Sequence, residues 1–176
     1  AINRKQASPG AFRRRNGEWQ RQTREVYDRG NGAVILLYNR STRRVILTRQ
    51  FRLPLFVNQH HGFLLEAAAG LLDDLDPQER IRHEAEEETG YRVDQVQKVF
   101  TAWMSPGSVT EQLHFFIAEY DDSRRTGNGG GLIDEGEDIE VVEMDFASAL
   151  AATRSGEIAD GKTIMLLQYL ALEGIL

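Results

Sequence analysis

Four glutamates fall within five residues of one short stretch, RHEAEEETGY, at positions 82–91. If this stretch is helical, residues three and four apart share a face, so Glu84, Glu87 and Glu88 project to one side and Glu86 to another. Like charges at this spacing destabilise an isolated helix by roughly 0.2–0.5 kcal/mol per pair. A divalent cation would offset the repulsion, because hard cations such as Mg²⁺ take oxygen ligands and keep waters for substrate phosphates. The stretch therefore predicts a metal-binding helical face.

A second acidic group lies further along the chain. Seven carboxylates occur within twelve residues: Asp134, Glu135, Glu137, Asp138, Glu140, Glu143 and Asp145. The segment 134–138 reads as a loop that can donate a carboxylate to the same metal. Arg24, Arg52 and Lys162 supply positive charge for a phosphate, and Gly70 lets backbone approach a ligand closely because it has no side chain. Together these residue types predict metal-assisted attack of water on a phosphoanhydride.

Strands and helices must position these groups. The pattern of apolar residues and turn residues predicts strands over 25–29, 33–38, 45–51, 63–68, 93–103, 112–120 and 139–144. Helices are predicted from Asp76-Pro77 to Gly90, where Asp is an N-cap and Gly a C-cap, and over about 146–155 and 161–173. Asn16-Gly17 indicates a hairpin near the N-terminus. The segments 53–62, 104–110 and 121–137 read as loops, and the last, long and glycine-rich, is predicted to be mobile and functional.

The bulk composition limits the class of protein. With 176 residues, 41% hydrophobic and 27% charged, the chain is expected to be one globular domain over 1–176. A formal charge of -6 argues against nucleic acid as the main partner. The absence of cysteine excludes disulfides and thiolate metal sites, and it favours a reducing compartment. No apolar run approaches the ~20 residues of a membrane span and no signal peptide is evident, so a cytoplasmic location is expected.

The acidic helix resembles the Nudix box, G-x5-E-x7-R-E-U-x-E-E-x-G-U, in which U is an aliphatic residue. The corresponding residues are Gly70, Asp76, His83, Glu84, Ala85, Glu87, Glu88, Gly90 and Tyr91. The E-U-x-E-E-x-G core is intact, but Asp76 stands for Glu, His83 stands for Arg, Tyr91 fills the last aliphatic position, and the spacer before the R-E pair is one residue shorter. Arg82, one residue earlier, is the candidate to replace the arginine that orients a glutamate.

The resemblance extends over about residues 24–173 and is poor over 1–23. Its segments are REVYDRGNG at 24–32, RQFR at 49–52, AGLLD at 69–73, MSPG at 104–107, HFFIAEY at 114–120, GGG at 129–131 and DGKT at 160–163. They are similar to the branch of the Nudix family that hydrolyses GDP-mannose. The resemblance implies an α/β fold, a Nudix α/β/α sandwich with a mixed β-sheet, in a homodimer with exchanged N-terminal strands. It also implies hydrolysis of GDP-mannose to GMP and mannose 1-phosphate with Mg²⁺, Mn²⁺ being the alternative.

Carried over position by position, the resemblance implies a metal held by the Ala69 carbonyl, Glu84, Glu88 and Glu137, with Glu87 as a further or indirect ligand. The substrate would contact Thr23, Arg24 and Glu25 of the partner subunit, together with Arg52, Ala69, Gly70, Leu71, Glu88, Glu111, Gly136, Glu137 and Lys162. Arg52 and Lys162 would stabilise developing negative charge. The general base stays open among Glu87, Glu137 and Asp138. Gly136 stands where an acidic residue is expected, in a segment two residues longer than in similar chains.

Three alternatives remain beside this interpretation. ADP-ribose and ADP-sugar pyrophosphatases share every catalytic feature, including a Ser-Pro at the distance that separates Pro106 from Gly90. A non-catalytic nucleotide sensor of the same fold would normally have lost carboxylates of the box, and these are retained. A prenyl diphosphate isomerase shares the fold as well, but its usual chemistry needs a cysteine that this chain lacks.

Overall fold

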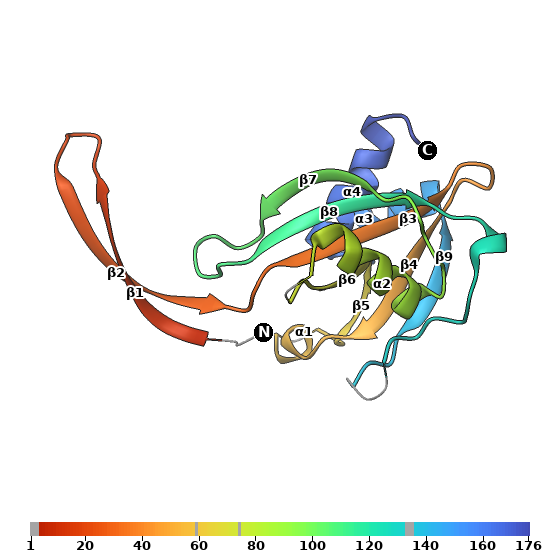
Figure 1. The fold of residues 1–176 in the computed structure, drawn as a ribbon, viewed down its shortest axis with the longest axis horizontal. Helices are drawn as coiled ribbons and strands as arrows, with labels where there is room; N and C mark the ends of the chain where they lie inside the picture. The colour runs from red at the N-terminus through yellow and green to blue at the C-terminus, as the bar shows by residue number, and fades with distance from the viewer. Residues whose placement is uncertain (1–3, 59, 74, 133–135) are drawn as a thin grey trace.

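The computed structural model describes residues 4–58, 60–73, 75–132 and 136–176. Figure 1 shows the chain as strands and helices gathered around one large sheet, with an N-terminal hairpin that extends away from it. The elements in chain order are β1 (Arg4–Arg13), β2 (Trp19–Asp28), β3 (Gly32–Asn39), β4 (Arg44–Phe51), α1 (Leu53–Val57), β5 (Phe63–Glu66), β6 (Ala68–Leu71), α2 (Pro77–Thr89), β7 (Gln97–Trp103), β8 (Gln112–Glu119), the 3₁₀ turn η1 (Asp122–Arg124), β9 (Glu140–Asp145), α3 (Phe146–Ser155) and α4 (Gly161–Leu172).

The large sheet is mixed. Among the described residues it has seven strands, with the path β5-β4-β3-β8-β7, while β6 also pairs with β3 and β9 with β4. The β3–β8 pair is parallel and the other pairs are antiparallel. Strands β1 and β2 form a separate two-stranded sheet, and Tyr27 of β2 also makes an isolated parallel bridge with Val109.

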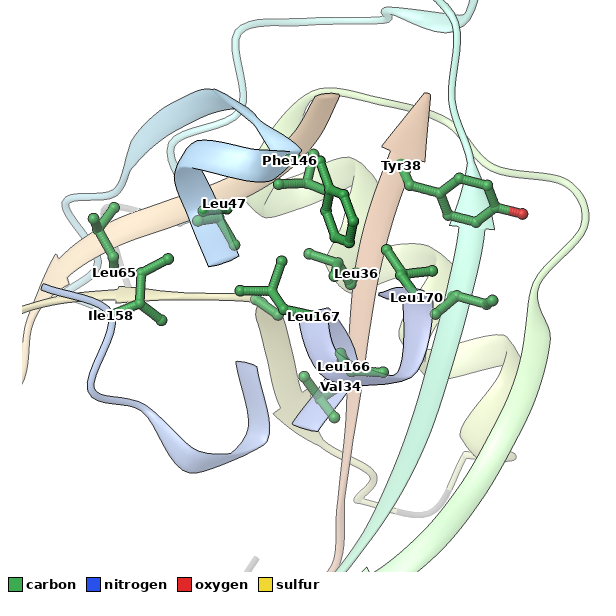
Figure 2. Packing of buried hydrophobic residues seen from close by; sticks show 14 of the residues in the cluster. Val34, Leu36, Tyr38, Leu47, Leu65, Phe146, Ile158, Leu166, Leu167 and Leu170 are labelled. Atoms are coloured by element: carbon green, nitrogen blue, oxygen red, sulfur yellow. The ribbon is translucent and has the colours of Figure 1, made fainter. Parts of the chain in front are cut away.

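Helices cover both faces of this sheet, as the central strand β3 shows. Every residue from Ala33 to Tyr38 is buried, as expected for a strand covered on both sides. Ala33, Ile35 and Leu37 belong to one core cluster with residues of α2, whereas Val34, Leu36 and Tyr38 belong to a second cluster with residues of α3 and α4. Figure 2 shows this second cluster, in which leucines of α4 and Phe146 of α3 cover the strand. The predicted mixed α/β/α sandwich is therefore confirmed.

Helix α2 begins and ends where its sequence predicts. The Asp76 carboxylate accepts hydrogen bonds from the backbone N–H groups of Gln78 and Glu79, and Pro77 occupies the first turn. Gly90 ends the helix with φ +76° and donates its N–H to the Glu86 carbonyl. These caps set the two ends of the helix.

Several boundaries differ from the sequence prediction. The predicted loop 53–62 contains the short helix α1, and the predicted strand 63–68 is two strands that continue to Leu71. The predicted strand 93–103 begins only at Gln97. The N-terminal hairpin forms around Asn16-Gly17 as predicted, but β2 is longer than the strand expected at 25–29, because it pairs with β1 along its whole length. No helix in the described part of the chain is long and apolar enough to cross a membrane.

Candidate active site

A cavity of about 640 Å³ lies where the ends of several elements meet. It is lined by Gly32 at the start of β3, by Arg52 directly after β4, and by residues of α1, β5, β6, α2, the start of β8, the loop before β9 and the start of α4. Nine of the predicted site residues are among the lining residues: Arg52, Ala69, Gly70, Leu71, Glu84, Glu87, Glu111, Glu137 and Lys162. The fold thus brings together most of the candidate positions from across the sequence.

The other predicted residues lie elsewhere. Glu88 is buried next to the cavity, and its Oε2 accepts a hydrogen bond from the Ala69 N–H at 3.3 Å. Gly136 and Asp138 are exposed and are not lining residues. Thr23, Arg24 and Glu25 are exposed on β2 and do not line the cavity of their own chain. Of the second acidic group, Asp134 and Glu135 lie outside the described residues.

The acidic wall comes from α2 and packs closely against β6. Glu84 and Glu88 are buried, with 5% and 2% of their surface exposed. A Cβ at Gly70 would overlap the Glu84 carboxylate, so a larger residue at this position would displace the Glu84 side chain. The pKa of Glu88 is held well above its usual range, first by burial and then by the negative charges of Glu84 and Glu137. Three carboxylates thus lie close enough to influence one another.

An arginine that the sequence interpretation missed holds Glu84 in place. Arg80 contacts Glu84 Oε1 at 2.5 Å and donates its Nε–H to the Leu71 carbonyl at 3.0 Å. The expectation that Arg82 orients a glutamate of the box was wrong. Residues 80 and 84 are one turn apart on the same face, whereas residue 82 points away from it. Arg82 lines a separate cavity with His83, and its buried Nε has no hydrogen-bond partner among the described residues.

The glycine run in the loop before β9 attaches that loop to the end of α2. Gly130 donates its N–H to the Glu88 carbonyl at 3.0 Å, and Gly131 donates to the Glu87 carbonyl at 3.2 Å. Gly129 has φ +66°, and a Cβ there would overlap the Glu88 carbonyl. A Cβ at Gly131 would overlap the side chain of Glu137. This contact, which we call the glycine clasp (129–131), therefore places Glu137 beside the acidic face of α2.

The Glu137 side chain is fixed further within its own loop. Its Oε2 accepts a hydrogen bond from the Leu132 N–H at 2.9 Å, and its N–H donates to the Leu132 carbonyl at 3.2 Å. No local pattern indicates that the glycine run contacts a helix end, because its partners are carbonyls some forty residues earlier.

The basic wall is organised around a buried carboxylate, Glu66 at the end of β5, which is 1% exposed. Arg52 Nε contacts Glu66 Oε1 at 2.6 Å, and Lys162 Nζ contacts Glu66 Oε2 at 2.6 Å. Asp160, the N-cap of α4, also lies 3.0 Å from Lys162 Nζ. Burial opposes the charged form of Arg52, but the hydrogen bond with Glu66 and its negative charge outweigh burial and raise the pKa of the guanidinium.

Sequence reasoning identified Arg52 and Lys162 but missed Glu66 and Asp160. One signal for Glu66 was present: it is the only charged residue in the run FLLEAAAG, which is otherwise apolar or small. A single ionisable residue in a buried strand needs a partner of opposite charge, so the sequence predicts a positively charged side chain near Glu66. Among the described residues, however, no group of three or more His, Asp or Glu side chains forms a ready-made metal site.

A mixed sheet between helices, with a cavity lined by the acidic face of a capped helix and by Arg52 and Lys162, agrees with the expected Nudix class of hydrolases. The family model of the NUDIX domain matches residues 28–165. The chain therefore belongs to the NUDIX family and is a Nudix hydrolase; enzymes of this family generally use divalent metals.

Relatives with a named activity agree with this class. The chain is 61% identical over 164 residues to a GDP-mannose pyrophosphatase of Pectobacterium atrosepticum, covering 93% of this chain and 84% of the relative. It is 57% identical over 164 residues to a GDP-mannose pyrophosphatase of Cronobacter sakazakii, covering 93% and 85%. It is 59% identical over 158 residues to a GDP-mannose pyrophosphatase of Salmonella typhimurium, covering 89% and 82%.

Proposed function

We propose that this chain is a Mg²⁺-dependent enzyme that hydrolyses GDP-mannose to GMP and mannose 1-phosphate, with Mn²⁺ as an alternative metal. The observation that carries the proposal is a single cavity lined by carboxylates of α2 together with Arg52 and Lys162. That combination suits a diphosphate and a divalent cation. The relatives at 57–61% identity favour GDP-mannose over ADP-ribose or an ADP-sugar.

The donor atoms fit a hard cation. The Ala69 carbonyl, Glu84, Glu88 and Glu137 would hold it, and Glu87 would act as a further or indirect ligand. All of these donors are oxygens, which Mg²⁺ and Mn²⁺ prefer. Burial and the negative charges of Glu84 and Glu137 disfavour the ionised form of Glu88, and a cation would reverse that preference. When bound, the metal neutralises diphosphate charge and lowers the pKa of a water.

The side chains of the cavity would carry out the remaining steps. The oxygen of a water forms a new bond to one phosphorus, and the bond from that phosphorus to the bridging oxygen breaks. Arg52 and Lys162 bind phosphate oxygens and stabilise the charge that develops on them. The water's proton passes to a carboxylate, for which Glu87 and Glu137 are better placed than Asp138, because they line the cavity.

Further substrate contacts follow from the lining residues. Gly70, Leu71 and Glu111 would contact the nucleotide or the sugar, since they line the same cavity. Gly136 is exposed outside it, so of the predicted substrate contacts in this loop Glu137 has the stronger support.

We also propose a cytoplasmic homodimer in which each chain is one Nudix domain and contributes its N-terminal hairpin to its partner. Figure 1 shows the β1–β2 hairpin extending away from the rest of the chain. Trp19, Phe12 and Tyr27 are exposed on it by 72%, 45% and 42%, and these apolar side chains would be available to contact a partner chain. Thr23, Arg24 and Glu25 on the same hairpin would reach the partner's cavity.

A subunit-mixing experiment tests the exchange. Arg24→Ala damages the hairpin contribution, and Glu88→Gln damages the acidic wall, so each variant alone is expected to be nearly inactive. Unfolding and refolding the two together would give mixed dimers in which one of the two sites is intact, and about one quarter of wild-type activity should return. If the mixture stays as inactive as the separate variants while dimers form, the hairpin does not act in the partner's site.

The activity itself is tested by following Mg²⁺-dependent release of GMP and mannose 1-phosphate from GDP-mannose, with ADP-ribose in parallel. Wild-type protein should cleave GDP-mannose faster, and Glu88→Gln should keep its fold but lose turnover. Cleavage of ADP-ribose alone would overturn the assignment of GDP-mannose as the substrate but would agree with the proposed hydrolytic mechanism. Normal turnover by folded Glu88→Gln would overturn the assignment of the acidic face.

A further inference from the structure

We infer that Glu66 is a positioning residue for catalysis, which holds Arg52 and Lys162 side by side as one paired binding group for the diphosphate. The inference deepens the proposed function and rests on it. Glu66 does not need to touch the substrate in this role. It acts through the two cations that it binds, one on each carboxylate oxygen at 2.6 Å.

The backbone around Glu66 is fixed from both sides. Thr48 of β4 donates its hydroxyl to the Glu66 carbonyl at 3.1 Å. The next residue, Ala67, donates its N–H to the Thr163 hydroxyl of α4 at 2.7 Å. Thr163 in turn donates its hydroxyl to Asp160 at 2.5 Å. The strand that carries Glu66 is thus joined directly to the helix turn that carries Lys162, so both the carboxylate and the lysine start from fixed positions.

Charge explains why the two cations need this carboxylate. Arg52 and Lys162 both line the cavity, and two positive charges there repel each other. Because each binds one oxygen of the Glu66 carboxylate, the Arg52 guanidinium and the Lys162 ammonium group are held close to each other. Without Glu66, Lys162 would keep Asp160 as a partner, but no other hydrogen bond from the Arg52 side chain to a described residue is present. Arg52, 38% exposed at its side chain, would turn towards water.

The arrangement also leaves donors for a ligand. The bond to Glu66 occupies Nε of Arg52, so its two terminal Nη groups are available to phosphate oxygens. Lys162 has three N–H donors, and Glu66 and Asp160 account for two of them. Each cation therefore retains hydrogen-bonding capacity, which suits adjacent oxygens of one diphosphate.

The test is a double-mutant cycle on GDP-mannose hydrolysis, with the variants Glu66→Gln, Lys162→Gln and the double variant. Glutamine keeps the shape of Glu66 but removes its charge and sets an amide against the ammonium group. We expect Glu66→Gln to lower kcat/KM by roughly 10- to 100-fold, mainly through kcat, because misplaced groups lose transition-state stabilisation. In the Lys162→Gln background the same change should cost several-fold less, since Glu66 acts partly through Lys162.

Glu140→Gln is the matched control. Glu140 of β9 contacts Arg49 of β4 at 2.5 Å, but in that pair both side chains are more than half exposed. Its loss should change kcat/KM by less than about twofold. Circular dichroism and thermal unfolding of each variant check that it folds. If Glu66→Gln does not fold, Glu66→Asp keeps the charge but shortens the reach, and it should lower kcat in the same background-dependent way.

The outcomes separate this inference from the proposed function. Equal losses from Glu66→Gln in both backgrounds would indicate a structural role and overturn the inference, as would unchanged kcat/KM in a folded variant. If wild-type protein does not cleave GDP-mannose, the proposed function fails, and the cycle is repeated as calorimetric binding of inorganic pyrophosphate. Glu66→Gln should then weaken binding about tenfold and Glu140→Gln should not. Equal affinities, or no binding by the wild type, would overturn the inference.

Discussion

Replacing Gly129 with alanine should both destabilise the protein and impair its site. Gly129 sits at φ +66° in the glycine clasp, and an added Cβ would overlap the Glu88 carbonyl. The segment must shift to relieve that overlap. The shift would weaken the bonds from Gly130 and Gly131 to the end of α2, and it would move Glu137 relative to that helix.

The size of the effect follows from these contacts. A side chain in the left-handed region costs about 1–2 kcal/mol. Each of the two clasp hydrogen bonds contributes about 0.5–1.5 kcal/mol if it is lost. Gly129→Ala should therefore lower the free energy of unfolding by about 2–5 kcal/mol, a large share of the ~5–15 kcal/mol typical of folded proteins.

Gly156→Ala is the control that isolates backbone strain. Gly156 ends α3 at φ +87°, and an added Cβ would meet nothing within 4 Å. Its replacement should cost about 1–2 kcal/mol and leave turnover unchanged. The measurements are urea unfolding at one protein concentration, because dimerisation would shift the midpoint, and kcat/KM for GDP-mannose, in which Gly129→Ala should lose roughly 10-fold or more. Equal destabilisation and equal activity of the two variants would refute the role of the clasp.

Three further changes have defined outcomes. Gly70→Ala should sharply reduce turnover because the new Cβ overlaps Glu84. Gly107→Ala has open space around its new Cβ and should leave turnover unchanged. Steady-state kinetics of both variants test this difference. Arg80→Ala should weaken Mn²⁺ binding, measured by electron paramagnetic resonance, because Glu84 loses the ion pair that orients it; unchanged affinity would contradict that role. Hydrogen bonds from the start of α3 lower the pKa of Asp145, so its folded-state pKa is below the unfolded value. Its stabilisation is therefore present above about pH 4 and fades as the pH falls through the folded pKa. The difference in urea midpoint between wild type and Asp145→Asn should shrink from pH 7 to pH 3.

The parts of the site that sequence patterns predicted correctly are those with local signals. The cap residues Asp76 and Gly90 fix α2 almost to the residue, and the acidic spacing on that helix places Glu84 and Glu88 on one buried face. The helix predicted over about 146–155 has these bounds in the structure, where Asp145 caps its start and Gly156 follows its end.

The parts that were missed depend on partners distant in sequence. The role of Glu66 depends on its ion pair with Lys162, which lies 96 residues later, and no local sequence pattern predicts that pair. The glycine clasp contacts carbonyls of α2, so a glycine run that reads as a mobile loop is in part a fixed contact. Arg80 was missed for a simpler reason. Attention to the box position occupied by His83 favoured its neighbour Arg82, although helical geometry favours Arg80, one turn before Glu84.

The order in which the walls of the cavity are synthesised has a consequence for folding in the cell. The acidic helix and Glu66 leave the ribosome well before β9, which pairs with β4, and before α4, which carries Lys162. Until those later elements dock, β4 lacks its pairing with β9 and the buried carboxylate of Glu66 lacks its lysine. A nascent chain that ends before β9 exposes an unpaired edge of β4, and one that ends before α4 leaves the Glu66 carboxylate with Arg52 as its only cation of the pair. An exposed strand edge favours binding by chaperones. Enzyme activity should begin only after α4 has emerged.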